Sequence, residues 1–434
     1  MKGSWLFVVL ALGACGEVLE TPLDGPADDG GGDAPPDVAV RGPVTVTVLD
    51  RTGSGAVAIG VPVAFVDPDG TIVAVEATDG QGKATAEILP GGSATAVVTI
   101  GNGKNATTIL AIAPGDDVVI GRTNPDQGTA GTFVVNWTQL GGANEYVIFG
   151  PCGFQGSAAA GVTTRTITLR NDCNPATMEL LIQARNTSNA TIGFSSKANI
   201  AVAAGSTTMG PFNNSLGFTG SFTNISRTTN LTMTRRAPDG LGFSDSITKD
   251  VSALTETTAS ATVPSTGSAR VDTTLSGTQN DSQEIHQRLA GNASTYGLDV
   301  AAVALPWINA PSLDVATRTI TITADATGTS GDVPDLVQTS LSWRRGGATS
   351  YSWVIFGPSL ESITLPALTG DLADALPTVG DAATGNRVVA YDADTFAGYA
   401  AVREATGAAI VGTFDDSPRG TAGLVRISTS VPGN

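Results

Sequence analysis

The sequence has few of the residues that active-site chemistry usually needs. Its 434 residues include only one histidine, and its three cysteines lack the Cys-x-x-Cys spacing of a zinc motif. Lysine and arginine together number 23, against 40 aspartates and glutamates. This acidic balance, with no stripe of basic residues, disfavours nucleic-acid binding. We therefore expect no metal, no cofactor and no nucleic-acid partner.

Aromatic residues are also scarce, at 5% of the chain, and charged residues make up only 15%. Glycine, threonine, valine and alanine take their place, a composition that favours strands and turns over helices. One hydrophobic core seldom organises a chain of 434 residues, so we expect roughly two to four domains.

The amino terminus has the pattern of a secretory signal, with Lys2, an apolar core at 5–12 and then small residues. The sequence Leu-Gly-Ala-Cys that ends at Cys15 resembles the lipobox of bacterial lipoproteins. The resemblance implies a signal peptide at 1–14, lipidation of Cys15 and a lipid anchor in the membrane of the cell envelope. Gly16, in place of an aspartate, favours the outer membrane. The alternative is a soluble secreted chain in which Cys15 is incidental.

Residues 15–43 follow the lipobox as an acidic segment rich in aspartate, glycine and proline. Apolar residues are too sparse there to repay the entropy of ordering, so we predict a disordered linker. Its aspartates lack the regular ligand spacing of a calcium loop. We interpret the segment as a solvated spacer.

Residues 44–121 consist of short runs of alternating apolar and polar residues, separated by turns at intervals of about eight to twelve residues. This pattern predicts a β-sandwich. The order of the segments GVPV, DPDG and ATDGQGKAT resembles carboxypeptidase regulatory-like and bacterial Ig-like modules, which implies a spacer or adhesin stalk. We assign Asp67 and Asp69 to a hairpin turn, because Asp-Pro-Asp-Gly forms one without an ion. Calcium binding by the two aspartates is the alternative.

Residues 122–209 resemble a fibronectin type III domain. Phe133, Val135 and Trp137 share one face of an early strand, as the buried tryptophan of such a sandwich requires. The later segment MELLIQAR again alternates inward and outward. We predict a second sandwich here.

A repeat predicts a related module near the carboxyl terminus. The segment WTQLGGANEYVIFGP at 137–151 is similar to WRRGGATSYSWVIFGP at 343–358. We therefore place a second fibronectin-like sandwich at 305–434 and a β-rich domain of unassigned type at 210–304. Short helices are expected at 371–376 and 396–404. The predicted fold class is all-β, with tandem β-sandwich domains after the signal peptide and linker.

Cys152 and Cys173 are the two cysteines that remain once Cys15 is acylated. An even count in an oxidising compartment favours a disulfide between them. Two free buried thiols are the alternative. Their spacing is not that of a redox or metal motif.

Catalytic signals are weak. His286 is the single histidine, and no Gly-x-Ser-x-Gly segment supplies a serine nucleophile beside it, so we interpret it as structural. Paired carboxylates for glycan hydrolysis are compatible with the composition, but the deep aromatic cleft that such chemistry uses is not expected. The Gly-rich segment at 101–106 lies between two predicted strands and lacks the following helix of a dinucleotide site.

Trp343, Tyr351 and Trp353 form the densest aromatic group. Two interpretations remain open for it, packing in a core and stacking on a sugar or peptide.

The sequence thus favours a non-enzymatic, envelope-anchored lipoprotein that presents β-sandwich modules for adhesion, scaffolding or partner binding. The protein or glycan partner is unknown. A carbohydrate-binding or glycan-hydrolysing accessory protein is the alternative.

Overall fold

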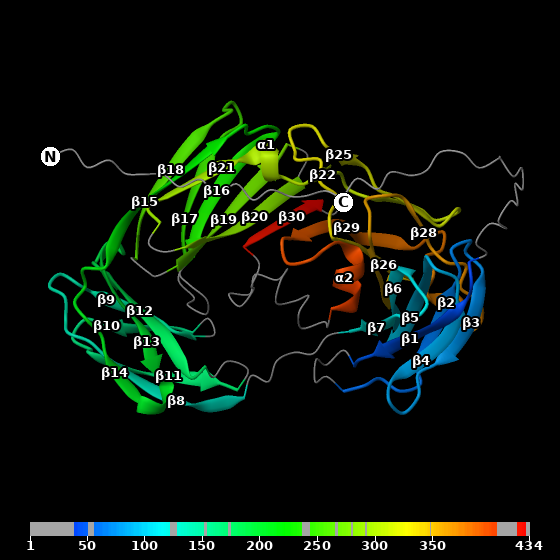
Figure 1. Ribbon diagram of the computed structural model, residues 1–434, viewed down its shortest axis with the longest axis horizontal. Coiled ribbons are helices and arrows are strands. Elements are labelled where there is room, and N and C mark those ends of the chain that lie inside the picture. The colour runs from blue at the N-terminus through cyan, green and yellow to red at the C-terminus, as the bar shows by residue number, and fades with distance from the viewer. Residues whose placement is uncertain are drawn as a thin grey trace, which may run out of the picture. The chain divides into compact units, whose positions relative to one another are not determined.

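Strands connected by turns make up nearly all of the regular structure, as the short alternating segments predict. The computed structural model describes residues 39–50, 56–121, 128–151, 154–171, 175–236, 244–264, 268–278, 281–290, 293–347, 349–405 and 423–430. From Val40 onward they belong to one compact unit. The predicted all-β class with tandem sandwich domains is confirmed (Figure 1).

The first sandwich pairs two sheets. One has the order β4-β1-β7, and the other contains β3, β2, β5 and β6 as neighbours. The valines of VTVTV in β1 all point into the core between them, which explains the alternation in the sequence. These seven strands are β1 (Gly42–Val48), β2 (Pro62–Val66), β3 (Ile72–Ala77), β4 (Lys83–Ile88), β5 (Gly92–Ile100), β6 (Gly103–Ile112) and β7 (Asp117–Ile120).

The second sandwich has sheets of its own, with orders β10-β9-β12-β13 and β11-β8-β14. Phe133, Val135 and Trp137 are buried in its core, as predicted from their common face. The strands are β8 (Thr129–Asn136), β9 (Glu145–Phe149), β10 (Gln155–Ala159), β11 (Thr164–Arg170), β12 (Thr177–Arg185), β13 (Thr191–Ala201) and β14 (Ser206–Thr208), with a 3-10 turn η2 (Val202–Ala204) before β14.

The third sandwich packs the sheet β18-β15-β21 against strands β17, β16, β19 and β20. Phe218 and Phe222 from one sheet meet Leu231 and Val271 from the other in its core. Its strands are β15 (Ser215–Thr223), β16 (Thr228–Arg236), β17 (Ser244–Asp250), β18 (Thr257–Pro264), β19 (Ser268–Gly277), β20 (Asp281–Ala290) and β21 (Thr295–Asp299), followed by the helix α1 (Val300–Val303).

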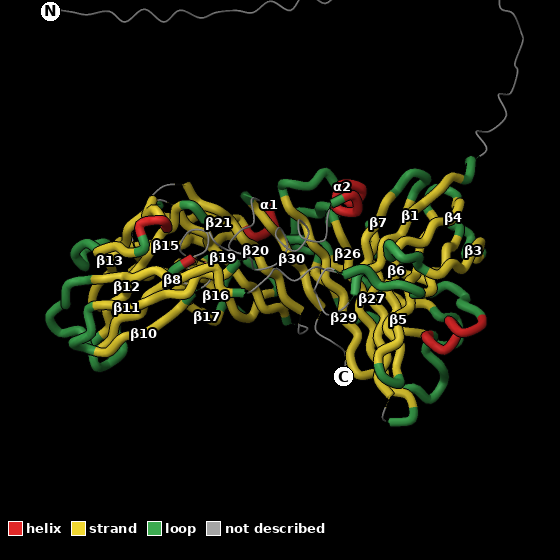
Figure 2. Tube along the Cα trace, turned by 90° about the horizontal axis from the view of Figure 1, so that it is seen from below, coloured by secondary structure: helices red, strands yellow, loops and turns green. Residues whose placement is uncertain are grey.

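The remaining chain joins the first and third sandwiches through one 12-stranded sheet of order β17-β16-β19-β20-β30-β29-β26-β27-β6-β5-β2-β3. Its four strands in this sheet are β26 (Leu336–Arg345), β27 (Thr349–Gly357), β29 (Ala382–Ala393) and β30 (Leu424–Ser430). Shorter elements pack beside it: β22 (Trp307–Ile308), β23 (Ser312–Asp314), β24 (Thr319–Thr321), β25 (Ala324–Asp325), β28 (Ile363–Thr364), the 3-10 helix η3 (Gly370–Ala375) and the helix α2 (Tyr399–Glu404). Figure 2 shows how strands dominate this region.

The larger of two hydrophobic clusters among the described residues of 305–434 is shared with the first sandwich. The hydrophobic cluster around Trp343 and Trp353 includes Ala64, Val97 and Ala106 from β2, β5 and β6. The sheet of the first sandwich is therefore covered on both faces, which fits the nearly continuous apolar run of β2. The predicted sandwich at 305–434 is therefore not wholly separate from the first one, because the shared sheet supplies one side of this larger cluster, while a smaller cluster around Val389 and Val402 is made of described residues of 305–434 only.

The two copies of the repeated sequence fold differently. In the first copy Trp137 follows β8, Tyr146 lies in β9, and these strands belong to opposite sheets. In the second copy Trp343 and Tyr351 are cross-strand partners in the β26–β27 hairpin. The repeat conserves an aromatic pair, with ring centroids 5.5 Å apart in one copy and 5.8 Å in the other. It does not conserve strand pairing.

The short helices expected near the carboxyl terminus are confirmed. The predicted segment 371–376 overlaps η3, and 396–404 contains α2. Among the described residues, no helix is long and apolar enough to cross a membrane.

Candidate functional site

Three of the predicted site residues lie outside the described residues: Cys15, Cys152 and Cys173. The described residues beside the last two belong to strands that meet in one core. Gly150 directly follows β9, and a Cβ placed on it would lie 3.4 Å from Cδ1 of Ile167 in β11. The disulfide between the two cysteines remains a prediction.

Asp67 and Asp69 form the predicted turn between β2 and β3. The Gly70 amide donates to the carbonyl of Asp67 at 2.9 Å, and the Thr71 amide donates to the Asp69 carboxylate at 2.9 Å. The Asp67 side chain is buried, accepts a hydrogen bond from the Leu89 amide at 3.0 Å and pairs with Arg41. The carboxylate of Asp67 thus ties the turn to two other segments of the first sandwich. In the described part of the chain, no three acidic, histidine or cysteine side chains gather as a metal site.

The segment 101–106 is a turn followed by the start of β6, so a strand stands where a dinucleotide site needs a helix.

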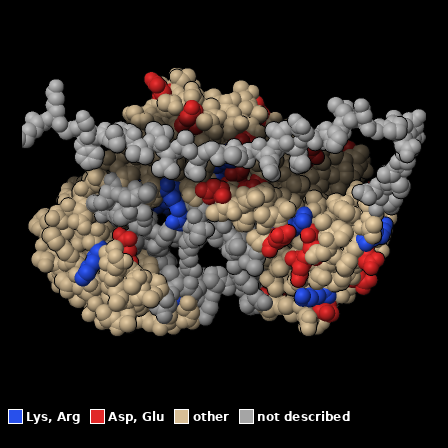
Figure 3. All heavy atoms as spheres, in the orientation of Figure 1, with Lys and Arg blue, Asp and Glu red and all other residues tan. Residues whose placement is uncertain are grey.

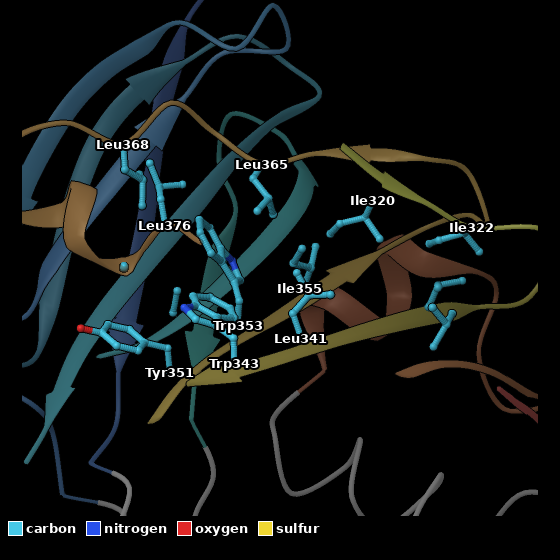
Figure 4. Packing of buried hydrophobic residues seen from close by; sticks show 14 of the residues in the cluster. Ile320, Ile322, Leu341, Trp343, Tyr351, Trp353, Ile355, Leu365, Leu368 and Leu376 are labelled. Atoms are coloured by element: carbon cyan, nitrogen blue, oxygen red, sulfur yellow. The ribbon is translucent and has the colours of Figure 1, made fainter. Parts of the chain in front are cut away.

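Trp343, Tyr351 and Trp353 pack in the core, as Figure 4 shows beside the leucines at 365, 368 and 376. Trp343 and Tyr351 stack with an interplanar angle of 6°, and Arg345 lies over the outer face of Tyr351 at 4.4 Å from the ring centroid. The Nε1–H of Trp353 donates to Oγ1 of Thr108 in β6 at 2.8 Å. Because all three rings are at most 5% exposed, core packing is the correct interpretation and ligand stacking on them is not.

His286 lies in a buried network of charges on β19 and β20. Its Nδ1 is 2.7 Å from Oδ1 of Asp272, and its Nε2 is 3.5 Å from Oε2 of Glu284. Arg270 donates to the same aspartate at 3.0 Å, and Arg236 pairs with it as well. One carboxylate therefore joins three cationic side chains from three neighbouring strands.

The charges of this network shift its pKa values strongly. Burial disfavours the charged ring of His286, but the hydrogen bonds to Asp272 and Glu284 outweigh burial and raise the pKa from 6.5 to about 9. Burial also opposes ionisation of Asp272, yet His286 and Arg270 hold its pKa well below 3.8. A histidine that stays protonated near neutral pH cannot accept a proton as a general base there. These contacts agree with a structural role for His286, which remains a prediction.

Sequence reasoning did not identify the partners of His286. Asp272 and His286 are 14 residues apart and become neighbours only through the register of β19 on β20. The register of two consecutive antiparallel strands depends on the turn between them, and the strands and turn of this region were not predicted from the sequence.

Arg235 is a second charged residue that the sequence did not single out. It is fully buried in the third sandwich, where Nη1 donates to the carbonyl of Pro264 at 3.1 Å and the guanidinium lies 5.2 Å from the centre of the Phe218 ring. Burial lowers its pKa from 12.5 to about 10. The residue remains charged at neutral pH, and its cation–π contact offsets part of the desolvation cost.

A latch built from α2 holds the first sandwich to the carboxyl-terminal strands. The Tyr399 hydroxyl is 3.0 Å from the carbonyl of Leu110 in β6 and 3.1 Å from that of Phe356 in β27. Arg403 pairs with Asp116 at 3.0 Å and donates to the carbonyl of Ala111. Beside the latch, β6 and β27 form a parallel ladder. These contacts join residues nearly 300 positions apart into one framework.

The second sandwich takes no part in the 12-stranded sheet. Among the described residues, the edge strands of its two sheets therefore pair with no strand of another module. On the face drawn in Figure 3 its surface is mostly uncharged.

No protein family model and no curated protein matches the chain. Among solved structures, it is similar to the Bacillus anthracis TIE protein at 12% identity over 60% of this chain, with a TM-score of 0.15. This chain spans 50% of the length of that protein. A tetra-tandem repeat in the extending region of a large adhesion protein matches at 14% identity over 80% of this chain and 95% of its own, with a TM-score of 0.13.

Two B repeat units of the collagen binding protein of Staphylococcus aureus match at 10% identity over 75% of this chain and 89% of theirs, with a TM-score of 0.14. At these identities and TM-scores, the similarities say nothing of ligand or partner. The chain is a protein of β-sandwich modules.

Proposed function

We propose that the protein is a non-enzymatic lipoprotein of the bacterial cell envelope, anchored through Cys15 in the outer membrane, that presents β-sandwich modules for partner binding, adhesion or scaffolding. The finer family assignments belong to this proposal: a carboxypeptidase regulatory-like or Ig-like first module and a fibronectin type III-like second module. The observation that carries it is the division of the chain into a framework and a presented module.

The framework is the sheet that unites the first sandwich, the third sandwich and the carboxyl-terminal strands. The presented module is the second sandwich, 129–209, which lies outside that sheet. A module that lies outside this sheet and has open edge strands among its described residues suits binding to another macromolecule. Catalysis has little support, because His286 is held by two carboxylates and the aromatic group is buried.

Anchoring can be tested in a bacterial host that processes lipoproteins. The full chain should partition into the detergent phase of Triton X-114 and carry a diacylated or triacylated Cys15 by mass spectrometry. The matched variant Cys15→Ser should move to the aqueous phase. A full chain that stays in the aqueous phase with an unmodified cysteine would remove the anchor from the proposal.

The non-enzymatic part can be tested on the purified chain with chromogenic ester and glycoside substrates. We expect turnover no faster than in buffer. Hydrolysis that is lost in His286→Gln while the fold is retained would contradict it.

A further inference from the structure

The edge strand β10 of the second sandwich exposes backbone groups that can pair with another strand. Among the described residues it is the terminal strand of its sheet and pairs only with β9, in a regular antiparallel register. The Gly150 amide donates to the carbonyl of Phe154, and the Ala160 amide donates to that of Asn144. Since hydrogen-bonded pairs alternate along an antiparallel ladder, residues 156 and 158 bond to β9, whereas the amides of Gln155, Ser157 and Ala159 point to the open edge.

The other edge strands in the described part of the chain carry the features that normally prevent such pairing. Among edge strands of four or more residues, only β10 and β18 have no charged residue. On β18 the carbonyl of Thr258 accepts a hydrogen bond from Lys249, and the strand ends at Pro264. The charged residues on the remaining edge strands include Glu76, Lys83, Glu87, Asp117, Arg170, Lys197, Asp245, Asp250 and Asp299. Among all these edge strands of the described residues, β10 alone lacks a charged residue, a proline and a bulge, so its open edge is unprotected.

A cation lies beside this edge. Arg165 in β11 shares the core-facing side of its strand with Ile167 and Leu169, but it is exposed at the open rim between the two sheets. A Cβ placed on Gly156 would lie 3.6 Å from Nε of Arg165, an ordinary contact distance, so the guanidinium lies close to the backbone of β10. A strand added next to β10 would place one of its inward-facing residues near this guanidinium, and an acidic residue suits that position.

We propose that β10 binds an extended segment of a partner polypeptide, which adds a strand to the sheet β10-β9-β12-β13 and places an acidic side chain beside Arg165. The inference rests on the proposed partner-binding function and names its surface. Backbone hydrogen bonds to residues 155 and 157 and to the amide of Ala159, whose carbonyl already accepts from Val162, supply the affinity, and Arg165 supplies selectivity. The small exposed side chains of β10, among them Ser157 and Ala159, leave room for larger side chains on the added strand.

The test uses the full chain and a fluorescein-labelled peptide, Thr-Val-Glu-Val-Thr-Val. Two matched peptides serve as controls, one with glutamine in place of glutamate and one with alternate backbone amides N-methylated. We expect the first peptide to bind and the N-methylated one to lose at least about tenfold in affinity, because it cannot donate to the open edge. This comparison changes only the peptide, so it tests the proposal even if a variant of the protein fails to fold.

Two variants then locate the site. Ser157→Pro removes an outward amide without removing a bond to β9, and it should weaken binding by at least about tenfold. Arg165→Gln should weaken binding of the glutamate peptide severalfold, so that the glutamate and glutamine peptides bind with equal affinity. The control Thr248→Lys changes an exposed residue on β17 and should leave binding unchanged.

Binding that is indifferent to N-methylation and to Ser157→Pro would overturn the proposal, as would no binding at peptide concentrations up to about 1 mM. Self-association of the unmodified chain that Ser157→Pro abolishes would overturn the choice of occupant and point to a second copy. None of these outcomes bears on the lipid anchor, whose test has its own readout.

Discussion

Asp272 and His286 lie opposite each other on β19 and β20, with Oδ1 of the aspartate 2.7 Å from Nδ1 of the histidine. Both side chains are largely buried. Because Glu284, Arg270 and Arg236 surround them, the pair is the centre of a network of charged side chains.

We predict that the stability of the third sandwich falls at alkaline pH. The pKa of His286 is about 9 in the folded protein and 6.5 when unperturbed. Its stabilising contribution is therefore complete below 6.5 and disappears as the pH rises through about 9. The loss should be on the order of 1–3 kcal/mol, measured by chemical denaturation across this range.

The contribution of Asp272 to stability depends on pH in the opposite sense. The pKa of Asp272 lies below its ordinary 3.8, so its contribution to stability is present above that value and is lost as the pH falls below it.

The variant His286→Gln should flatten the alkaline decline in stability that His286 causes. A decline of unchanged size in that variant would assign it to other groups.

Removing the latch should destabilise the junction between the first sandwich and the carboxyl-terminal strands. Tyr399→Phe deletes one hydroxyl that bonds to two carbonyl groups, and it should cost about 1 kcal/mol of unfolding free energy. Arg403→Met leaves the largely buried carboxylate of Asp116 without its ion-pair partner, at a cost on the order of 2–4 kcal/mol. Denaturant titration would check both. Arg344→Met, on an exposed arginine of β26, should change stability by less than about 0.5 kcal/mol.

The close approach of β6 and β27 gives a sharper test. A Cβ at Gly103 would overlap the carbonyl oxygen of Ser350 in β27. Gly103→Ala should therefore cost more than about 2 kcal/mol and lower the melting temperature, because backbone atoms must shift. The matched control is Gly217→Ala in β15, where a Cβ meets nothing within 4 Å. Equal effects of the two substitutions would argue against the β6–β27 ladder.

Cys152 and Cys173 remain predicted to form a disulfide. It would close a loop of about 20 residues and stabilise the second sandwich by about 3 kcal/mol. Thiol titration of the denatured, unreduced mature protein should find neither sulfhydryl free. The double variant Cys152→Ser/Cys173→Ser should unfold at lower denaturant concentration, and reduction should have no further effect on it. Two titratable thiols in the unreduced protein would exclude the bond.

Much of the local structure could be predicted from the sequence. Alternation identified the core face of β1 and the buried side of β8 with Trp137, and Asp-Pro-Asp-Gly identified the turn at 67–70. These features depend on residues close together in the chain, because side-chain direction alternates with every residue of a strand. The helices near the carboxyl terminus were predictable for the same reason.

The candidate site was predicted less well. The aromatic group at 343–353 was found, but whether it was core or surface stayed open, since some of the residues that cover it come from β2, β5 and β6, far away in the sequence. His286 was found without its partners, and Arg165 was not singled out. Its position beside Gly156 depends on how two sheets face each other, which no local pattern records.

What the sequence determined by itself is therefore the strand content, the buried face of individual strands and the turns between them. Tertiary structure alone decided which strands became neighbours. Backbone hydrogen bonds are the same for every sequence, so alternation specifies a face but not a partner. The similar segments at 137–151 and 343–358 accordingly place one aromatic pair across two sheets and the other within a hairpin.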